Sequence, residues 1–192
     1  QWRNRAGLRI DNTLSFSVLE QGGYPYAYVG EEIVHDGQTV IRPGEIRYND
    51  PCSYRRTTLS DGLTVRYDAG SFSVASITSY QYSDDEMILD QDFLPLSYFT
   101  LKQARTEHTF TEDIVFRSHE RGAYRWLLGA FGFYRHGVMN APVHFKQTGI
   151  EELILSNANE HDPQYTYDAW DDDELLLGSR FRNPSAGGAL YY

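Results

Sequence analysis

The strongest constraint in this sequence is a set of long segments in which apolar and polar side chains alternate. In residues 55–67, one parity is mostly apolar: Thr57, Leu59, Leu63, Val65 and Tyr67, with Asp61 as the exception. The other parity is Thr58, Ser60, Gly62, Thr64 and Arg66. Because side chains of a strand point alternately to its two faces, this period of two predicts a strand with one apolar face.

The same pattern recurs in pairs of segments separated by short turn sequences. Residues 55–67 and 71–83 flank Asp68-Ala69-Gly70, and residues 106–118 and 123–135 flank residues 119–122. These pairs predict two hairpins. The outer face of 123–135 stays open, because both parities contain large apolar residues. Residues 5–11 and 14–21 suggest a further hairpin around Asn12, and residues 184–192 suggest the start of a seventh strand.

Four of these arms are about 13 residues long, whereas strands of soluble proteins usually have about 5 to 6. At about 3.3 Å per residue and a tilt near 45°, such an arm rises roughly 30 Å, which is enough to cross an outer membrane. The predicted turns at 11–13, 68–70 and 119–122 also alternate with long segments at 22–54, 84–105 and 136–183. We therefore expect an all-β fold: an antiparallel transmembrane β-barrel segment of about seven strands, with short periplasmic turns and long extracellular loops.

Composition restricts the function classes. The longest apolar run is far below the 18 residues of a membrane helix, but barrel strands need no such run. A net charge of -10 argues against nucleic acid as a partner. The start of the chain has no signal-peptide pattern, and the single Cys52 forms no zinc motif.

An odd number of strands is unusual for a bacterial single-chain barrel, and an open sheet edge in lipid leaves backbone groups unpaired. We therefore expect residues 1–192 to be part of a single β-barrel domain in a longer parent chain, with no plug domain in this piece.

Residues 59–136 resemble consecutive barrel strands of TonB-dependent outer-membrane receptors. The resemblance lies in RYDAGSFSVASITSYQYSDDEMILDQDF, in TEHTFTEDIVFRS and in YRWLLGAFGFYRH. It implies a location in the bacterial outer membrane and energised uptake of a scarce nutrient such as an iron–siderophore complex. Its implied partners are outer-membrane lipid, a small nutrient ligand at the extracellular loops, and the TonB complex, contacted through a plug of the parent chain.

Candidate ligand contacts lie in the loops. Tyr24, Tyr26 and Tyr28 form an aromatic cluster near Gly and Pro, and Trp170 lies in the third loop. Such rings stack on sugars or aromatic siderophores, but they also pack loops and form the interfacial aromatic girdle of a barrel. The third loop also holds nine of the 27 acidic residues between Glu151 and Glu174, which favours a solvated surface. Thr148-Gly149-Ile150-Glu151 has capping-box spacing and predicts a short helix there.

The six histidines lack metal-site spacing, and no nucleophile motif is present, so we expect no metal, no cofactor and no catalytic residues. Two alternatives to transport remain: a small outer-membrane barrel enzyme acting on lipids, and a surface barrel that presents adhesive loops.

Overall fold

The protein is described here by a computed structural model that covers residues 2–3, 7–23, 26–119, 124–161 and 174–192. Most of the chain forms antiparallel β-structure. The strands are β1 (Trp2–Arg3), β2 (Leu8–Gly22), β3 (Ile33–His35), β4 (Gln38–Ile41), β5 (Ser53–Asp68), β6 (Phe72–Asp90), β7 (Phe99–Ser118), β8 (Leu127–Asn140), β9 (Val143–Lys146), β10 (Glu174–Leu177) and β11 (Arg180–Tyr191). Helical residues form α1 (Gln147–Gly149), a π-helical turn (Ile150–Leu155) and α2 (Ser156–His161).

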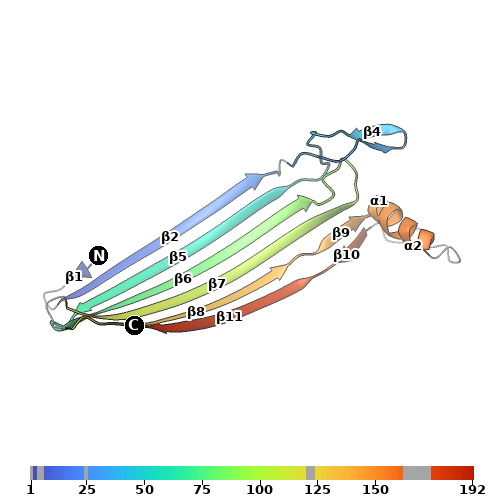
Figure 1. The fold of residues 1–192 in the computed structure, drawn as a ribbon. Helices are drawn as coiled ribbons and strands as arrows, with labels where there is room; N and C mark the ends of the chain where they lie inside the picture. The colour runs from blue at the N-terminus through green and yellow to red at the C-terminus, as the bar shows by residue number, and fades with distance from the viewer. Residues whose placement is uncertain (1, 4–6, 24–25, 120–123, 162–173) are drawn as a thin grey trace.

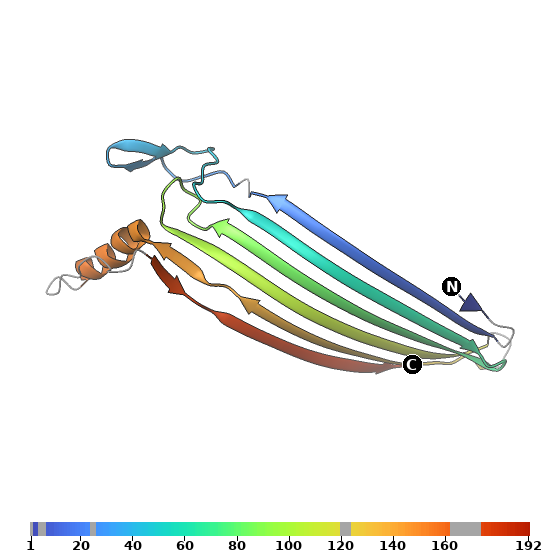
Figure 2. The same cartoon turned by 180° about the vertical axis from the view of Figure 1, so that it is seen from behind.

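The long strands lie side by side in one sheet, in the order β1-β2-β5-β6-β7-β8-β11 (Figure 1). Every neighbouring pair is antiparallel. At one end, β9 pairs with β7 and β10, and the small hairpin β3–β4 and the helices lie beyond the strands (Figure 2). We call this the loop end. The opposite end, where β5 meets β6, is the turn end.

The strands are as long as the alternation predicts or longer: β2 has 15 residues, β5 16, β6 19, β7 20 and β8 14. The predicted hairpin around residues 68–70 is confirmed by the ladder from Asp68–Ser73 to Ser53–Ile88. Gly70 has φ +84°, and its N–H donates to the Asp68 side chain at 2.9 Å. A residue with positive φ and an Asp that bonds two residues ahead are what such a turn requires.

The predicted hairpin around Asn12 is wrong. β2 runs continuously through this position, where Asn12 lies opposite Leu63. The Asn12 amide donates to Asp61 Oδ1 of β5 at 2.7 Å, and this cross-strand partner lets a turn-forming residue remain in a strand. The chain reverses instead between β1 and β2, next to Gly7 with φ +76°. The path still contains seven strands, with β1 in place of the predicted split of β2.

The predicted loop at 84–105 is also mostly wrong, because β6 continues to Asp90 and β7 begins at Phe99. The acidic residues of this segment are compatible with a strand since basic residues on neighbouring strands pair with them. Asp85 pairs with Arg56 at 2.5 Å, and Glu86 with Lys102 at 3.1 Å. The loop-end connection 91–98 is therefore no longer than the turn-end connection 119–126. The predicted difference between short turns and long loops is wrong for these two connections.

The third connection is shorter than predicted as well. β8 extends to Asn140, and β11 already begins at Arg180. Pro184 lies within β11, opposite His136 of β8.

The third connection contains a helix as predicted, here directly after β9, but the capping box is wrong. The helix starts at Gln147 after Lys146, without a side-chain cap, so Thr148 lies inside it. Gly149 lies against the backbone of loop 91–98, where an added Cβ would be 2.2 Å from the Tyr98 carbonyl oxygen. None of the described helices is long and apolar enough to span a membrane.

The pairing register places the alternating residues on two distinct faces. The apolar face carries Leu8, Ile10, Leu14, Phe16, Val18, Leu59, Leu63, Val65, Tyr67, Val74, Tyr80, Tyr82, Phe110, Ile114, Phe116, Leu128, Ala130, Tyr134 and Leu190. The polar face carries Arg9, Asp11, Ser15, Ser17, Arg56, Thr58, Ser60, Arg66, Ser73, Ser79, Gln81, Asp85, Glu107, Thr111, Asp113, Arg117 and Arg135. The register also determines which side chains of β8 lie on which face. Leu128 and Tyr134 belong to the apolar face, and Phe131 and Phe133 belong to the polar face.

The sheet has no packed layer on either face in the described part of the chain. Its buried apolar residues are Ile41, Cys52, Leu89 and Ile150, all near the loop end. The outer strands β2 and β11 are not paired with each other. The observed architecture is therefore one large open antiparallel sheet, with the separate two-stranded sheet β3–β4 beyond its loop end.

Candidate functional site

The apolar face is an exposed surface rather than a core. Large side chains at its two edges are the most open: Leu14 is 66% exposed, Phe16 67% and Leu190 82%. Towards the turn end, the rings of Phe72 and Trp126 lie 6.4 Å apart. An apolar surface spread over six strands is far larger than the patches that monomeric soluble proteins usually leave uncovered.

The polar groups on this apolar face are paired with one another. Asn12 donates to Asp61 across β2 and β5. Glu112 of β7 accepts hydrogen bonds from Ser76 at 2.6 Å and from Thr78 at 2.5 Å, both on β6. Such pairing reduces the cost of placing these groups in an apolar surrounding.

The polar face carries a network of charged and hydroxyl groups. Glu107 accepts hydrogen bonds from Arg105 and, at 2.5 Å, from Arg135. Asp85 binds Arg56 and the Tyr54 hydroxyl. Both carboxylates line a hollow of about 190 Å³, together with Gln81, Ser83 and Thr109. Closer to the turn end, the Tyr191 hydroxyl donates to Asp113 at 2.6 Å. This face is suited to contact with water or a polar ligand.

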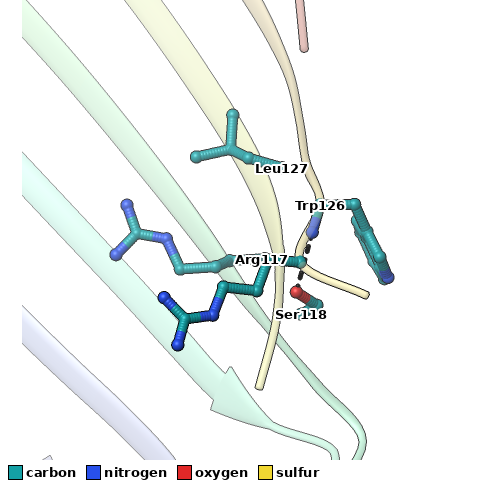
Figure 3. Close-up of a pocket in the computed structure, with 5 residues that line it drawn as sticks. Arg117, Ser118, Trp126 and Leu127 are labelled. Atoms are coloured by element: carbon teal, nitrogen blue, oxygen red, sulfur yellow. Dashed lines mark hydrogen bonds between the residues drawn. The ribbon is translucent and has the colours of Figure 1, made fainter. Parts of the chain in front are cut away.

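A larger hollow of about 340 Å³ lies at the turn end, between the last residues of β7 and the first of β8 (Figure 3). Arg117, Ser118, Arg125, Trp126 and Leu127 line it. The backbone N–H of Trp126 donates to Ser118 Oγ at 2.9 Å and so links the end of β7 to the residue that precedes β8. The Trp126 ring lies on the opposite side of the ribbon from the Arg117 guanidinium, in agreement with the two faces (Figure 3).

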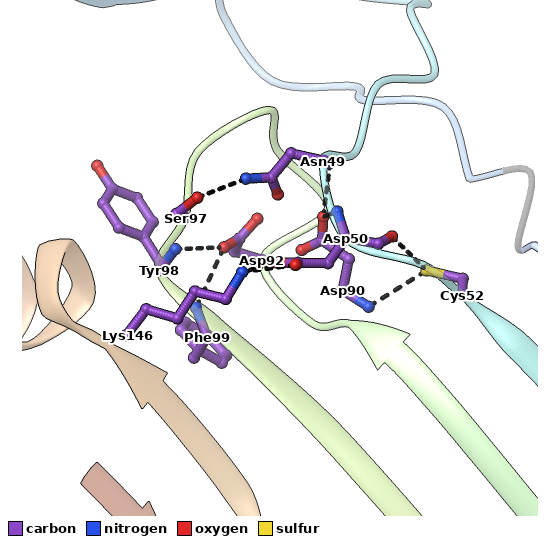
Figure 4. Close-up of polar contacts among 9 residues, drawn as sticks. All are labelled: Asn49, Asp50, Cys52, Asp90, Asp92, Ser97, Tyr98, Phe99 and Lys146. Carbon is purple, nitrogen blue, oxygen red and sulfur yellow. Dashed lines mark hydrogen bonds and ion pairs between the residues drawn. The ribbon is translucent and has the colours of Figure 1, made fainter. Parts of the chain in front are cut away.

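At the loop end, a hub of polar contacts joins four segments of the chain (Figure 4). Asp90 is fully buried at the end of β6, and its Oδ2 accepts the backbone N–H groups of Asn49 at 3.0 Å and Asp50 at 3.2 Å. The Asp90 N–H donates to Cys52 Sγ at 3.2 Å. Lys146 of β9 binds the Asp50 carboxylate at 2.5 Å. Asp90 Oδ1 has no hydrogen-bond partner among the described residues.

Asp92 is a further carboxyl group of this hub. It accepts the N–H groups of Leu94 at 2.8 Å and Tyr98 at 3.2 Å, and so shapes loop 91–98. Burial raises the pKa of Asp92, nearby Asp90 raises it as well, and the backbone N–H donors of Leu94 and Phe99 lower it; the resulting pKa is about 6. Burial and a hydrogen bond to Glu152 raise the pKa of Tyr98 to about 12. The hub therefore holds the loop end with groups that titrate far from their ordinary range.

Two of the predicted ligand tyrosines, Tyr26 and Tyr28, make different contacts in the described structure. The Tyr26 ring packs edge-on against Phe93 of loop 91–98, with centroids 5.3 Å apart. The Tyr28 ring lies over Gly30, and the backbone N–H of Tyr28 donates to the Glu45 carbonyl at 2.9 Å. These contacts favour loop packing, and neither residue lines the hollows described above. Tyr24 and Trp170 lie outside the described residues.

The sequence predicts neither the hub nor the turn-end hollow. Asp90 and Asp92 lie in residues 84–105, which the sequence predicts to be a long loop. Burial of their carboxyl groups is therefore not expected from the sequence. Alternation predicts the face of Arg66, but only the strand register shows that Arg66 and Arg117 lie at the same end of the sheet. Over the described residues, no three His, Cys, Asp or Glu side chains gather as a metal site would require.

Comparisons of the chain with family models, with curated proteins and with solved structures found no match.

Proposed function

We propose that this chain forms part of the wall of a bacterial outer-membrane β-barrel that takes up a scarce nutrient. The observation that carries the proposal is the large sheet with one apolar and one polar face, on neither of which the described residues pack a second layer. In water such a sheet leaves its apolar face uncovered, whereas in a bilayer lipid covers that face and the polar face lines the lumen.

The dimensions of the sheet support this proposal. Strands of 14 to 20 residues extend roughly 45 to 65 Å at about 3.3 Å per residue. With a tilt near 45° they rise about 30 to 45 Å, which spans the hydrocarbon region and projects beyond it. The loop end then faces outwards and the turn end faces the periplasm.

A wall in lipid needs further strands at both edges. The edges of β2 and β11 present backbone groups that no described strand satisfies along most of their length. Unpaired backbone groups in hydrocarbon cost several kcal/mol each, so closure into a barrel is the arrangement in which this sheet is stable. We expect neighbouring strands of the same barrel to pair with β2 and β11.

The transport role rests on the resemblance of residues 59–136 to TonB-dependent receptors, and on loops that gather at one end of the sheet. In that role the wall performs no covalent chemistry. Its loops take part in capturing the nutrient, and the energised TonB complex acts through a plug domain of the receptor.

Spin labels test the membrane wall directly. Cys52 is the single cysteine, so in a Cys52→Ser background one label is placed at Phe16→Cys or Phe110→Cys on the apolar face. Matched labels are placed at Ser17→Cys and Thr111→Cys on the polar face. In phospholipid vesicles, apolar-face labels should collide with dissolved oxygen and be protected from a water-soluble nickel chelate, and polar-face labels should show the reverse. Equal access of the nickel chelate to both faces would contradict the wall.

Uptake tests the transport role separately. Deletion of the gene in its own host should reduce uptake of a labelled iron chelate, and an uncoupler should abolish the difference between the two strains. Uptake that is unchanged by the deletion for siderophore, haem and cobalamin ligands alike would argue for a barrel with another role.

A further inference from the structure

We propose that the turn end of the polar face is a binding site for a small anion that carries phosphate or carboxylate groups, held by Arg66, Arg117 and Arg125. This inference adds a ligand class to the proposed function. The location of the site in the lumen of a barrel rests on the proposed function.

The strand register brings two of these arginines to one place. Arg66 of β5 pairs with Ala75 of β6, and Arg117 of β7 pairs with Ser73, two residues away on the same strand. Both arginines have the parity of the polar face, and only β6 separates them. Their backbones are therefore about 10 to 12 Å apart, a gap that two long guanidinium side chains can bridge through one anion.

Arg125 extends the cluster. It lines the same hollow as Arg117, together with Ser118 and Leu127. A second hollow of about 400 Å³ is lined by Arg66 and Arg117, so that Arg117 is common to both. These volumes lie in the range of small-molecule pockets, which favours a compact ligand over the broad surface of an acidic protein.

These three arginines differ from the others of the polar face in having no acidic partner. Within the described residues, no ion pair or side-chain hydrogen bond involves them. By contrast, Arg9 binds Asp11, Arg56 binds Asp85, and Arg105 and Arg135 bind Glu107. In a chain of net charge -10, an uncompensated basic cluster is a local reversal of charge that attracts anions.

The carboxylates of the polar face near this end are engaged elsewhere. Asp11 binds Arg9, Asp68 accepts from Gly70 and His119, and Asp113 accepts from Tyr191. They are therefore not available to neutralise the cluster without breaking these contacts.

The surroundings of the arginines suit a phosphate or carboxylate. The guanidinium fork donates two parallel hydrogen bonds to such groups. Ser73 adds a hydroxyl, and Ala75, Val115 and Leu127 provide an apolar floor. An apolar floor lowers the local dielectric and strengthens the attraction between the charges.

Calorimetric titration of the chain in neutral phospholipid vesicles tests the site, with pyrophosphate and citrate as probes and sucrose as the uncharged control. We expect saturable binding of both anions, weakened about tenfold by Arg117→Gln and less by Arg66→Gln or Arg125→Gln. Arg56→Gln is the matched control, because it removes an arginine of the same face that already has a carboxylate partner. It should leave the affinity nearly unchanged. Circular dichroism of each variant checks that the sheet is retained.

Three results would overturn the site. One is equal affinity in the native chain and in the triple Arg→Gln variant. Another is an equal loss in Arg56→Gln, which would indicate general surface charge. The third is binding of a poly-glutamate peptide alone, which would make the cluster a protein-docking surface. The same titration in detergent micelles separates this inference from the proposed function: failed vesicle insertion with retained binding in micelles contradicts only the membrane wall, and insertion without anion binding contradicts only the site.

Discussion

At the scale of single residues, the loop end depends on two neighbouring carboxyl groups. Asp90 is fully buried with Oδ1 unpartnered among the described residues, and Asp92 lies two positions further along. Two close carboxylates repel when both are charged, so a proton held by Asp92 stabilises the hub. Glu152 and the Tyr98 hydroxyl lie beside this loop, and Lys146 offsets the charge of Asp50.

This arrangement makes the loop end less stable at higher pH. The pKa of Asp92 is about 6 in the folded protein and 3.8 for the ordinary group, so the folded state binds the proton more tightly. The resulting stabilisation is fully present below about pH 4 and is lost as the pH rises through about 6. Amide exchange at Asn49, Asp50 and Tyr98, corrected for the intrinsic rate, should show opening on the order of tenfold more frequent at pH 8 than at pH 5.

Asp92→Asn should remove this pH dependence, because the amide cannot titrate. Amides at the turn, such as those of Ala69 and Gly70, provide the internal control and should not respond to the substitution. If the pH dependence persists in Asp92→Asn, another group of the hub is responsible.

At the scale of strands, cross-strand partners decide where a strand continues. Asn12 and the acidic residues after Ser83 are unfavourable in strands by propensity. Each is nevertheless in a long strand, since Asp61 accepts from Asn12 and since Arg56 and Lys102 neutralise Asp85 and Glu86. Local propensity is a weak guide where a neighbouring strand supplies the missing partner.

The Asn12–Asp61 pair allows a test of this explanation in vesicles. Asn12→Leu should lower the free energy of unfolding by about 1 to 3 kcal/mol, because Asp61 then lacks its donor on the apolar face. Asp61→Leu should have a smaller effect, and the double variant should be close to the native stability, because apolar residues suit that face. Urea unfolding, followed by tryptophan fluorescence, gives the free energies of unfolding of the four proteins in this double-mutant cycle. Purely additive losses would show that the hydrogen bond does not couple the two strands.

At the scale of the whole molecule, the described part of the chain lacks the core that usually stabilises a sheet. Its few buried apolar side chains lie near the loop end, while six long strands expose both faces. Hydrogen-bonded ladders alone do not offset the loss of conformational entropy on folding in water. Such a sheet needs an apolar environment for one face and partners for its edges, which is the reason that the membrane wall is the function we propose.

Alternation and turn residues are local properties, and they predict antiparallel β-structure with long strands, the hairpin around residues 68–70 and the two faces of residues 55–67. The tertiary structure decided the continuity of β2, the extension of β6 and β7, the apolar face of β8, the loop-end hub and the gathering of Arg66 and Arg117. All of these depend on which residues of distant segments become neighbours, and strand register, not local preference, sets those neighbours.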